Sequence, residues 1–255
     1  MTVLRTRHLD VEIGKTLVCR DLNLDIEAGQ RWAILGRNGS GKTTLLLTLA
    51  GLRRATAGSI ELKGRCIRRT QRRRIAQQLG LLPQDSQDSL PATVLETALI
   101  GRHPHLTPWV RESEADRSLA RAALAAVDLT GFENREISTL SGGERRRLAL
   151  ATLLTQDPEL LLLDEPVNHL DLHHQVRVLE LLVAQSEQRR KTLLMVLHDP
   201  NLAARFAGHC LLLFGAGRTR HGPCHELLQQ SQLETLYGHR LVTLRSGDHP
   251  AWLPA

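Results

Sequence analysis

The stretch GRNGSGKT, Gly36 to Thr43, decides the fold of this chain. It matches the pattern G-x-x-x-x-G-K-[S/T] and follows an apolar run, Arg31 to Leu35, that has the character of a buried strand. The glycines let the backbone wrap closely around an anion, so that N–H groups and the positive end of a helix point at phosphate. The pattern therefore predicts a phosphate-binding loop, followed by a helix over Thr43 to Leu49 that Gly51 ends.

Two side chains of this loop have a chemical role beyond shaping the backbone. Lys42 would hold the β and γ phosphates of a nucleotide. Thr43 would offer its hydroxyl to Mg²⁺, which prefers oxygen ligands and retains waters. The other residues expected to contact the nucleotide around this loop are Gly36, Arg37, Asn38, Gly39, Ser40, Gly41 and Thr44.

A second apolar run, Leu160 to Leu163, is followed by two carboxylates. Asp164 and Glu165 would stand at the carboxyl end of a strand, where open α/β sheets bind ligands. Asp164 would position Mg²⁺, and Glu165 would orient and polarise an attacking water. Taken alone, this pair could equally be an ordinary strand-end turn, so its interpretation depends on the phosphate loop.

The stretch TLSGGERRRLAL, which begins at Thr139, predicts another anion site. Gly142 and Gly143 let the backbone approach a ligand closely, and the helical pattern from Glu144 places a helix N-terminus there. A single chain rarely needs two such sites for one triphosphate. The pattern therefore favours a shared site, in which Ser141, Gly142 and Gly143 of one subunit grip the γ-phosphate bound by another. The alternative is a loop that only caps a helix.

The motifs GRNGSGKT, LSGGE, LLLLDEP and VLHD, in this order and at this spacing, resemble the Walker A, signature, Walker B and switch-histidine motifs of ABC-type ATPases. The resemblance covers nearly the whole chain. It implies an α/β fold with a P-loop NTPase (RecA-like) core and a mixed sheet, an antiparallel β subdomain and an inserted α-helical subdomain. It also implies that ATP and Mg²⁺ are the cofactors.

The same resemblance assigns roles to single residues. Gln84, in LLPQD, would be the lid-loop glutamine that touches the Mg²⁺ and water site and connects it to a transmembrane partner. Asp171 would belong to the D-loop across a dimer interface, and His198 would contact the γ-phosphate. Ile13 stands where the family usually has an aromatic residue stacked on adenine, which implies looser nucleotide binding. Pro200 is compatible with the first turn of a helix.

We expect one ATPase domain over residues 1–255. Its catalytic core and β subdomain would occupy approximately 1–88 and 156–255, and a helical signature subdomain approximately 89–155. In that helical part, the spacing predicts one apolar face made of Leu119, Ala122, Ala123 and Ala126. Further strands are expected at Val3 to Asp10, Leu22 to Glu27 and Thr192 to Leu197.

The net charge of +6 does not by itself indicate nucleic acid binding. Aromatic residues make up 3% of the chain and none is interleaved with the arginine-rich stretch GRCIRRTQRRR, so a stacking platform for bases is not expected. This stretch predicts either a solvated surface or one attracted to anionic lipid or an acidic partner. No apolar run approaches the roughly 20 residues of a membrane span, and the N-terminus lacks a secretory signal, so we expect a cytoplasmic chain.

The stretches IGRHPH, NHLDLHHQ and VLHDPNLAARFAGH resemble importers of iron–siderophore complexes, haem or vitamin B12. This implies a homodimer of the ATPase subunit, peripheral at the cytoplasmic face of the inner membrane, with integral membrane permease subunits and, indirectly, a substrate-binding protein. One alternative is a non-transport ABC ATPase that acts on nucleic acid or in a soluble assembly machine. Another is a P-loop kinase, which would leave the LSGGE stretch without a purpose.

Overall fold

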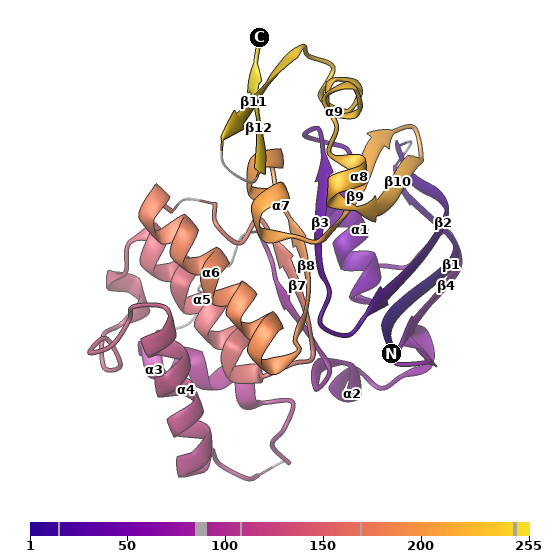
Figure 1. Cartoon of the computed structure of the whole chain (residues 1–255). Coiled ribbons are helices and arrows are strands. Elements are labelled where there is room, and N and C mark those ends of the chain that lie inside the picture. Colours follow the sequence, from indigo (N-terminus) through magenta and orange to yellow (C-terminus); the bar gives the residue numbers. More distant parts are fainter. Residues whose placement is uncertain (15, 85–90, 108, 169, 247–248) are drawn as a thin grey trace. The chain divides into compact units, whose positions relative to one another are not determined.

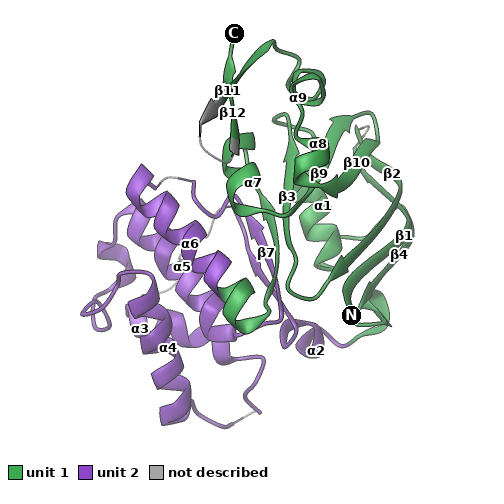
Figure 2. Cartoon of the chain, viewed as in Figure 1, with its two compact units in different colours: residues 1–70, 185–255 green, residues 71–184 purple. Residues whose placement is uncertain are grey.

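The computed structural model describes residues 1–14, 16–84, 91–107, 109–168, 170–246 and 249–255. The chain forms two compact units, shown in Figures 1 and 2: unit 1 is Met1–Thr70 with Gln185–Ala255, and unit 2 is Gln71–Ala184. The predicted start of the helical subdomain at residue 89 lies outside the described residues. Unit 1 is therefore built from the two ends of the sequence and unit 2 from its middle.

An antiparallel sheet with the strand order β2-β1-β4-β5 forms one part of unit 1. Its strands are β1 (Thr2–Ile13), β2 (Thr16–Glu27), β4 (Ala57–Leu62) and β5 (Arg65–Cys66). The two strands predicted in this region are confirmed, and both extend further than the apolar pattern suggested. Thr6 of β1 is fully buried, and its hydroxyl donates to the Leu22 carbonyl of β2 at 2.8 Å, so the buried polar group is satisfied.

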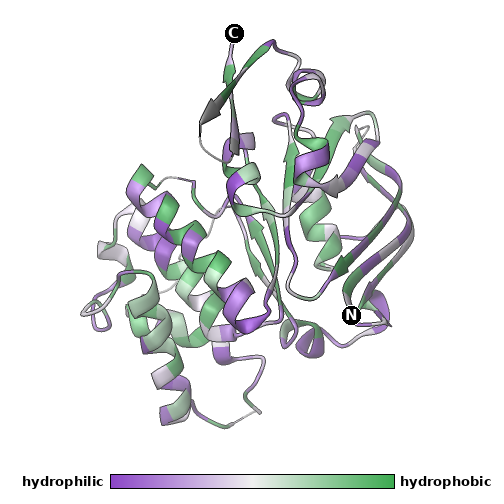
Figure 3. Cartoon of the chain, in the orientation of Figure 1, coloured by the Kyte–Doolittle hydropathy of each residue, from purple (hydrophilic) through white to green (hydrophobic). Residues whose placement is uncertain are grey.

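A second group of strands in unit 1 has β3 (Arg31–Gly36) at its centre. This strand pairs in parallel with β8 (Thr192–Val196) on one side and β9 (His209–Gly215) on the other. β9 in turn pairs antiparallel with β10 (Arg218–Pro223). Residues of β8 are buried without interruption, as expected for a strand covered on both faces, and Figure 3 shows the hydrophobic character of these strands. The predicted strands at residues 31–35 and 192–197 are confirmed.

Helices complete unit 1 at the positions that the local sequence indicates. Gly51, which follows the C-cap residue Ala50 of α1, has φ +69, which confirms that it ends this helix. Pro200 occupies the first turn of α7, as predicted, and the Asp199 side chain caps that helix by accepting from the Asn201 N–H at 2.7 Å. The remaining elements are α1 (Lys42–Leu49), η1 (Ile67–Arg69), α7 (Pro200–Phe206), α8 (Cys224–Leu227), α9 (Gln230–Tyr237), β11 (Leu241–Ser246) and β12 (His249–Pro254).

Unit 2 combines two parallel strands with a group of helices. Strand β6 (Leu79–Leu82) pairs with β7 (Leu160–Asp164), with Leu79 opposite Leu160. Helices α3, α4 and α5 pack against one another, so the middle of the chain is helical as predicted. The other elements are α2 (Arg72–Ala76), α3 (Val94–Leu99), η2 (Ile100–Arg102), α4 (Glu114–Ala126), η3 (Ile137–Thr139), α5 (Gly142–Gln156) and α6 (Leu172–Arg189), whose last residues belong to unit 1.

The buried face of α4 differs from the predicted one. Leu119 is 40% exposed, and Ala122 and Ala126 are also exposed. Ala123 is buried as predicted, together with Ala120 and Leu124. The helix carries so many alanines that several faces are apolar enough to pack, and periodicity alone does not choose among them. Packing on α3 and α5 selects the face of Leu124.

A polar network holds the start of α4. The Ser113 hydroxyl donates to the Asp116 carboxylate at 2.7 Å, and Asp116 also accepts from the Ser113 N–H at 2.9 Å in a capping box. The Arg102 guanidinium of η2 donates to the other carboxylate oxygen at 2.7 Å. These bonds, led by that of the Ser113 hydroxyl, lower the pKa of Asp116 from its ordinary value of 3.8 to about 2.

Replacing the charge in this network should make unit 2 less stable in a pH-dependent way. Because the folded pKa of Asp116 is depressed, its ionised form stabilises the fold above about pH 4, and this contribution is lost as the pH falls from 3.8 towards 2. Asp116→Asn should therefore lower the free energy of unfolding by about 1 kcal/mol at pH 7. Urea unfolding of both proteins at pH 7, 5 and 3 measures this, and a difference that stayed constant down to pH 3 would contradict it.

Candidate active site

The predicted phosphate loop joins β3 to α1 in unit 1. Lys42 lies in the first turn of α1 and is only 6% exposed. Its ammonium donates to the carbonyls of Gly36 and Arg37, at 2.9 and 3.1 Å. A buried ammonium needs such partners, and these two carbonyls hold it beside the backbone of the loop.

Two glycines of the loop are required by its shape. Gly41 has φ +91, and a Cβ placed there would overlap the Val18 side chain of β2. A Cβ on Gly36 would come within 2.9 Å of the Leu213 carbonyl of β9. The Ser40 hydroxyl oxygen is buried and has no hydrogen-bond partner among the described residues. A tight glycine turn with an unsatisfied hydroxyl and a buried ammonium fits a phosphate group.

Other predicted nucleotide contacts also belong to unit 1. Arg37, Asn38 and Gly39 are exposed, whereas Thr44 is buried and Thr43 half-buried. His198 follows β8 and is exposed, and its carbonyl accepts from the Tyr237 hydroxyl at 3.3 Å. The last residue of β1, Ile13, is 41% exposed and therefore open to a planar ligand such as a base.

The predicted carboxylates lie in unit 2, at the carboxyl end of β7. Asp164 is the last residue of this strand and is 2% exposed, and Glu165 is 8% exposed. Glu165 has φ +50, a left-handed conformation that costs a non-glycine residue about 1–3 kcal/mol. Its carboxylate accepts from the Gln84 amide at 3.3 Å and from the Asn168 amide at 2.9 Å. The fold therefore brings the predicted Gln84 and Glu165 together.

A buried arginine of α5 holds the backbone around these carboxylates. One terminal nitrogen of Arg146 donates to the carbonyls of Pro83 and Gln84, at 2.6 and 3.1 Å. The other donates to the carbonyls of Asp164 and Glu165. Arg146 is 6% exposed, so these carbonyls provide much of the polar environment that a buried guanidinium requires. It links the segment after β6 to the segment after β7.

The signature stretch begins helix α5, as predicted. Ser141 caps the helix, because its hydroxyl accepts from the Glu144 N–H and its own N–H donates to the Glu144 carboxylate at 2.7 Å. The pKa of Glu144 is lowered, first by the N–H of Ser141 and then by its hydroxyl. A Cβ placed on Gly142 would meet nothing within 4 Å, so a ligand has room to approach there. Gly143 is the second residue of the helix, and the shared role of this stretch stays a prediction.

Asp171 has a local bonding role at the start of α6. Its carboxylate accepts from the His174 N–H at 2.9 Å and contacts the His174 ring at 3.0 Å. The backbone bond is the main cause of its lowered pKa, and the His174 ring adds to it. Asp171 is exposed and ionised, which is compatible with its predicted place at an interface.

Two residues of this site were not predicted from the sequence. Arg146 is followed at i+4 and i+7 by the buried Leu150 and Leu153, so it lies on an apolar helix face. An arginine in that position must have polar partners inside the protein, and this was the signal in the sequence. Asn168 lies three residues after Glu165, within reach of its carboxylate across a turn.

A sequence profile of the ABC transporter family matches residues 19–168. The chain belongs to the ABC transporter family. The petrobactin import ATP-binding protein FpuD of Bacillus anthracis is 41% identical over 82% of this cassette and 77% of that relative. The hemin import ATP-binding protein HmuV of Burkholderia ambifaria is 37% identical over 99% of this cassette and 100% of that relative.

Solved structures show the same fold. A structure described as a metal-chelate type ABC transporter in an inward-facing conformation matches with a TM-score of 0.87 and 28% identity, over 100% of this cassette and 98% of that chain. A dimeric cassette with bound ADP and phosphate matches with a TM-score of 0.75 and 25% identity, over 87% and 98%. The predicted P-loop α/β fold and the family are thus confirmed. Among the described residues of this cassette, no helix has the length and apolar character of a membrane span.

Removing the Arg146 guanidinium should separate hydrolysis from nucleotide binding. Arg146→Ala leaves the carbonyls around Gln84 and Glu165 without their donor, so the carboxylate of Glu165 loses its position, while the phosphate loop belongs to the other unit. We expect the ATP hydrolysis rate to fall at least about tenfold and ATP affinity to stay within about threefold. Loss of buried bonds should also lower the unfolding free energy by about 3–5 kcal/mol.

The matched control is Arg147→Ala in the same helix. Arg147 also donates to two backbone carbonyls, those of Val127 and Asp128. Neither carbonyl belongs to the segments that carry Gln84, Asp164 and Glu165. Hydrolysis assays and ATP titrations of both folded variants measure the difference. Equal loss of hydrolysis in the two variants would mean that Arg146 acts only through general stability.

Proposed function

We propose that this cassette hydrolyses ATP to energise import of iron–siderophore, haem or cobalamin-type cargo through a membrane permease. The observation that carries the catalytic part is the strained, buried Glu165, whose carboxylate is fixed by Gln84 and Asn168. The import part is supported by the relatives, which are named for import of petrobactin and hemin. Cargo would not touch this subunit, so its class rests on those relatives alone.

The proposed chemistry is transfer of the γ-phosphoryl group to water by positioning and charge stabilisation. Lys42 binds the phosphates through its ammonium, and the N-terminus of α1 adds its partial positive charge. Glu165 accepts a hydrogen bond from the attacking water and aligns it. No covalent intermediate with the protein is required.

Mg²⁺ fits the residues proposed to hold it. The Thr43 hydroxyl, the Asp164 carboxylate and the Gln84 amide oxygen are hard oxygen donors, which is the ligand set that Mg²⁺ prefers. The Gln84 amide nitrogen already donates to Glu165, so its oxygen is directed away from that carboxylate. The bound ion would supply charge neutralisation of the phosphates.

Two copies of the cassette are proposed to share each ATP. The open N-terminus of α5 at Ser141, Gly142 and Gly143 of one subunit would bind the γ-phosphate held at Lys42 of the other. His198 would contact the same phosphate, and Asp171 would act across the interface. The dimeric cassette structure with ADP and phosphate supports this arrangement.

The dimer is proposed to work at the cytoplasmic face of the inner membrane, as a peripheral subunit beneath integral permease subunits. The structural match to a metal-chelate type transporter supports this place. Gln84 would couple the state of the ATP site to the permease, because the segment that carries it is bonded to both the carboxylate strand and α5. A substrate-binding protein would deliver cargo on the other side of the membrane.

Glu165→Gln should trap an ATP-bound dimer. The amide keeps the shape of the side chain but is uncharged and a weaker hydrogen-bond acceptor for the attacking water. ATP should therefore bind and close the dimer without being hydrolysed. Size-exclusion chromatography with light scattering should show a monomer that becomes a dimer when MgATP is added. Hydrolysis at the parent rate would contradict the role of Glu165, and a persistent monomer with bound ATP would contradict the shared site.

Lys42→Ala in the same background is the matched control for that experiment. It removes the ammonium from the phosphate loop, so MgATP should bind weakly and no dimer should form at the same nucleotide concentration. A dimer that formed equally well without Lys42 would show that association does not depend on ATP at the loop.

Ile13→Tyr should tighten ATP binding. A base stacked on an aromatic ring gains about 1–3 kcal/mol, which corresponds to an affinity increase of roughly 5-fold to 150-fold. Ile13→Leu serves as the control, because it keeps an apolar side chain of the same size without a π face. Calorimetric titration with ATP measures the difference, and an unchanged affinity in the tyrosine variant would remove Ile13 from the adenine site.

A further inference from the structure

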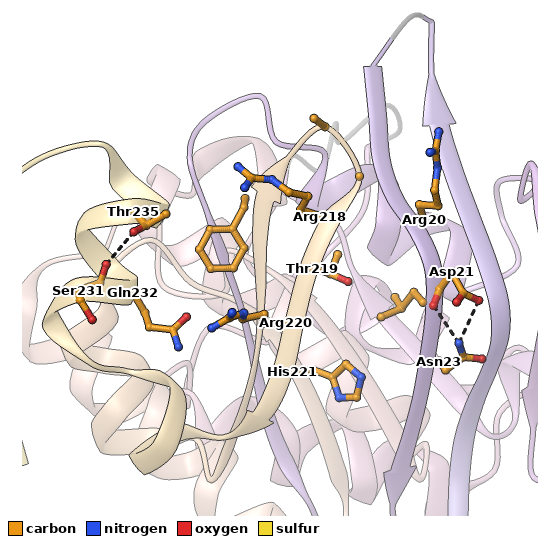
Figure 4. Close-up of a pocket in the computed structure, with 14 residues that line it drawn as sticks. Arg20, Asp21, Asn23, Arg218, Thr219, Arg220, His221, Ser231, Gln232 and Thr235 are labelled. Atoms are coloured by element: carbon orange, nitrogen blue, oxygen red, sulfur yellow. Dashed lines mark hydrogen bonds between the residues drawn. The ribbon is translucent and has the colours of Figure 1, made fainter.

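A groove of about 980 Å³ lies in unit 1, between strand β2, strand β10 and helix α9. Figure 4 shows its polar walls. No described residue of the phosphate loop lines it, so it is separate from the nucleotide site. Its volume is at the upper end of the range of about 300–1,000 Å³ that small-molecule sites occupy, and it far exceeds the size of a single phosphate ion.

Three arginines give the groove an excess of positive charge. Arg20 comes from β2, and Arg218 and Arg220 come from β10. None of these guanidinium groups has an ion-pair or hydrogen-bond partner within the described ranges of the chain. The acidic residue of the lining, Asp21, is hydrogen-bonded to His8 at 2.7 Å and to Asn23 at 3.1 Å, and its single negative charge is outnumbered by the three arginines.

The arginines of β1, which lies in the same sheet as β2, are paired, unlike Arg20 in the described part of the chain. On the neighbouring strand β1, Arg5 and Arg7 both pair with Asp25, at 2.6 and 2.8 Å. An anion that binds beside these exposed guanidinium groups gains Coulomb energy without having to break an ion pair.

The walls of the groove are fixed before a ligand arrives. The turn between β9 and β10 is bonded to β2 by the Arg20 N–H to the Gly217 carbonyl, at 3.0 Å, and by the Gly217 N–H to the Leu17 carbonyl, at 2.9 Å. Arg218 and Arg220 point from β10 towards α9, which presents Gln232 and Thr235 (Figure 4). Pre-formed walls lower the entropy cost of binding.

We propose that this groove binds a phosphorylated small molecule of nucleotide size. Guanidinium groups bind phosphate through two parallel hydrogen bonds, and an amide such as that of Gln232 adds a further donor. The space left beyond two phosphoryl groups is bounded in part by the half-buried side chain of Phe214, which suits a ring. This inference does not depend on the proposed transport function.

Binding in the Lys42→Ala protein tests the proposal, because that variant weakens the phosphate loop. ADP and inorganic tripolyphosphate are titrated calorimetrically at low salt, and we expect one saturable site per chain for each. Arg218→Ala combined with Arg220→Ala should weaken both ligands at least about tenfold, as loss of two charge-assisted contacts implies.

Arg68→Ala combined with Arg72→Ala is the matched control. Both are exposed, lie outside the groove and carry the same total charge as the pair in β10, so their removal should change affinity less than about twofold. Equal weakening by the two double variants would overturn the proposal in favour of non-specific charge attraction. Absence of saturable binding to the folded protein would overturn it too, as would residual binding insensitive to Arg218 and Arg220. Tighter binding of a hexaglutamate peptide than of tripolyphosphate would instead indicate an acidic protein partner.

Discussion

The structure of unit 1 depends on one steric constraint, which is that the backbone after β3 must turn where no side chain fits. At Gly36 the carbonyl of Leu213 on β9 comes too close for a Cβ, and at Gly41 the side chain of Val18 on β2 does the same. The loop is therefore pressed from both groups of strands in this unit. This contact fixes the loop without a ligand, and the ammonium of Lys42, held by two loop carbonyls, completes it. A nucleotide would meet a site that is already organised, and preorganisation is the main source of electrostatic catalysis.

In unit 2, the surrounding structure holds the backbone of Glu165 in a conformation that this residue would not adopt alone. The left-handed backbone of Glu165 stores about 1–3 kcal/mol of strain, and a buried guanidinium costs several kcal/mol if it is unpaired. Arg146 offsets both costs together, because its bonds to the carbonyls of Asp164 and Glu165 stabilise the strained turn and satisfy the guanidinium. Since Arg146 stands two residues after Glu144 of the signature stretch, the start of α5 and the carboxylate turn form one bonded assembly. A movement of α5 would therefore be felt at Gln84 and Glu165.

What the sequence predicted well are features that depend on neighbouring residues alone. The strand before the phosphate loop, the glycine that ends α1 and the proline that begins α7 were all correct, because apolar runs, glycine and proline act locally. The predicted buried face of α4 was correct at Ala123 alone, since the helix's alanines suit several faces and only packing on other helices selects one. Arg146 and Asn168 were missed for the same reason, as their partners are carbonyls and a carboxylate whose positions depend on tertiary structure. The proposed division at residues 88 and 155 and the roles of the site residues stay predictions.

Two kinds of arginine in this chain have different physical meaning. Arg146 is buried, and its hydrogen bonds are to the protein itself, so it contributes to structure and is not available to a ligand. Arg218 and Arg220 are exposed on one strand, and no partner for them occurs in the described part of the chain, so their charge is available. The net charge of +6 therefore has little meaning as a total. A buried arginine has lost its hydration, so the fold itself must supply its hydrogen-bond partners. Exposed arginines that line one groove remain hydrated and can still bind an anion, as is proposed for the groove beside β10.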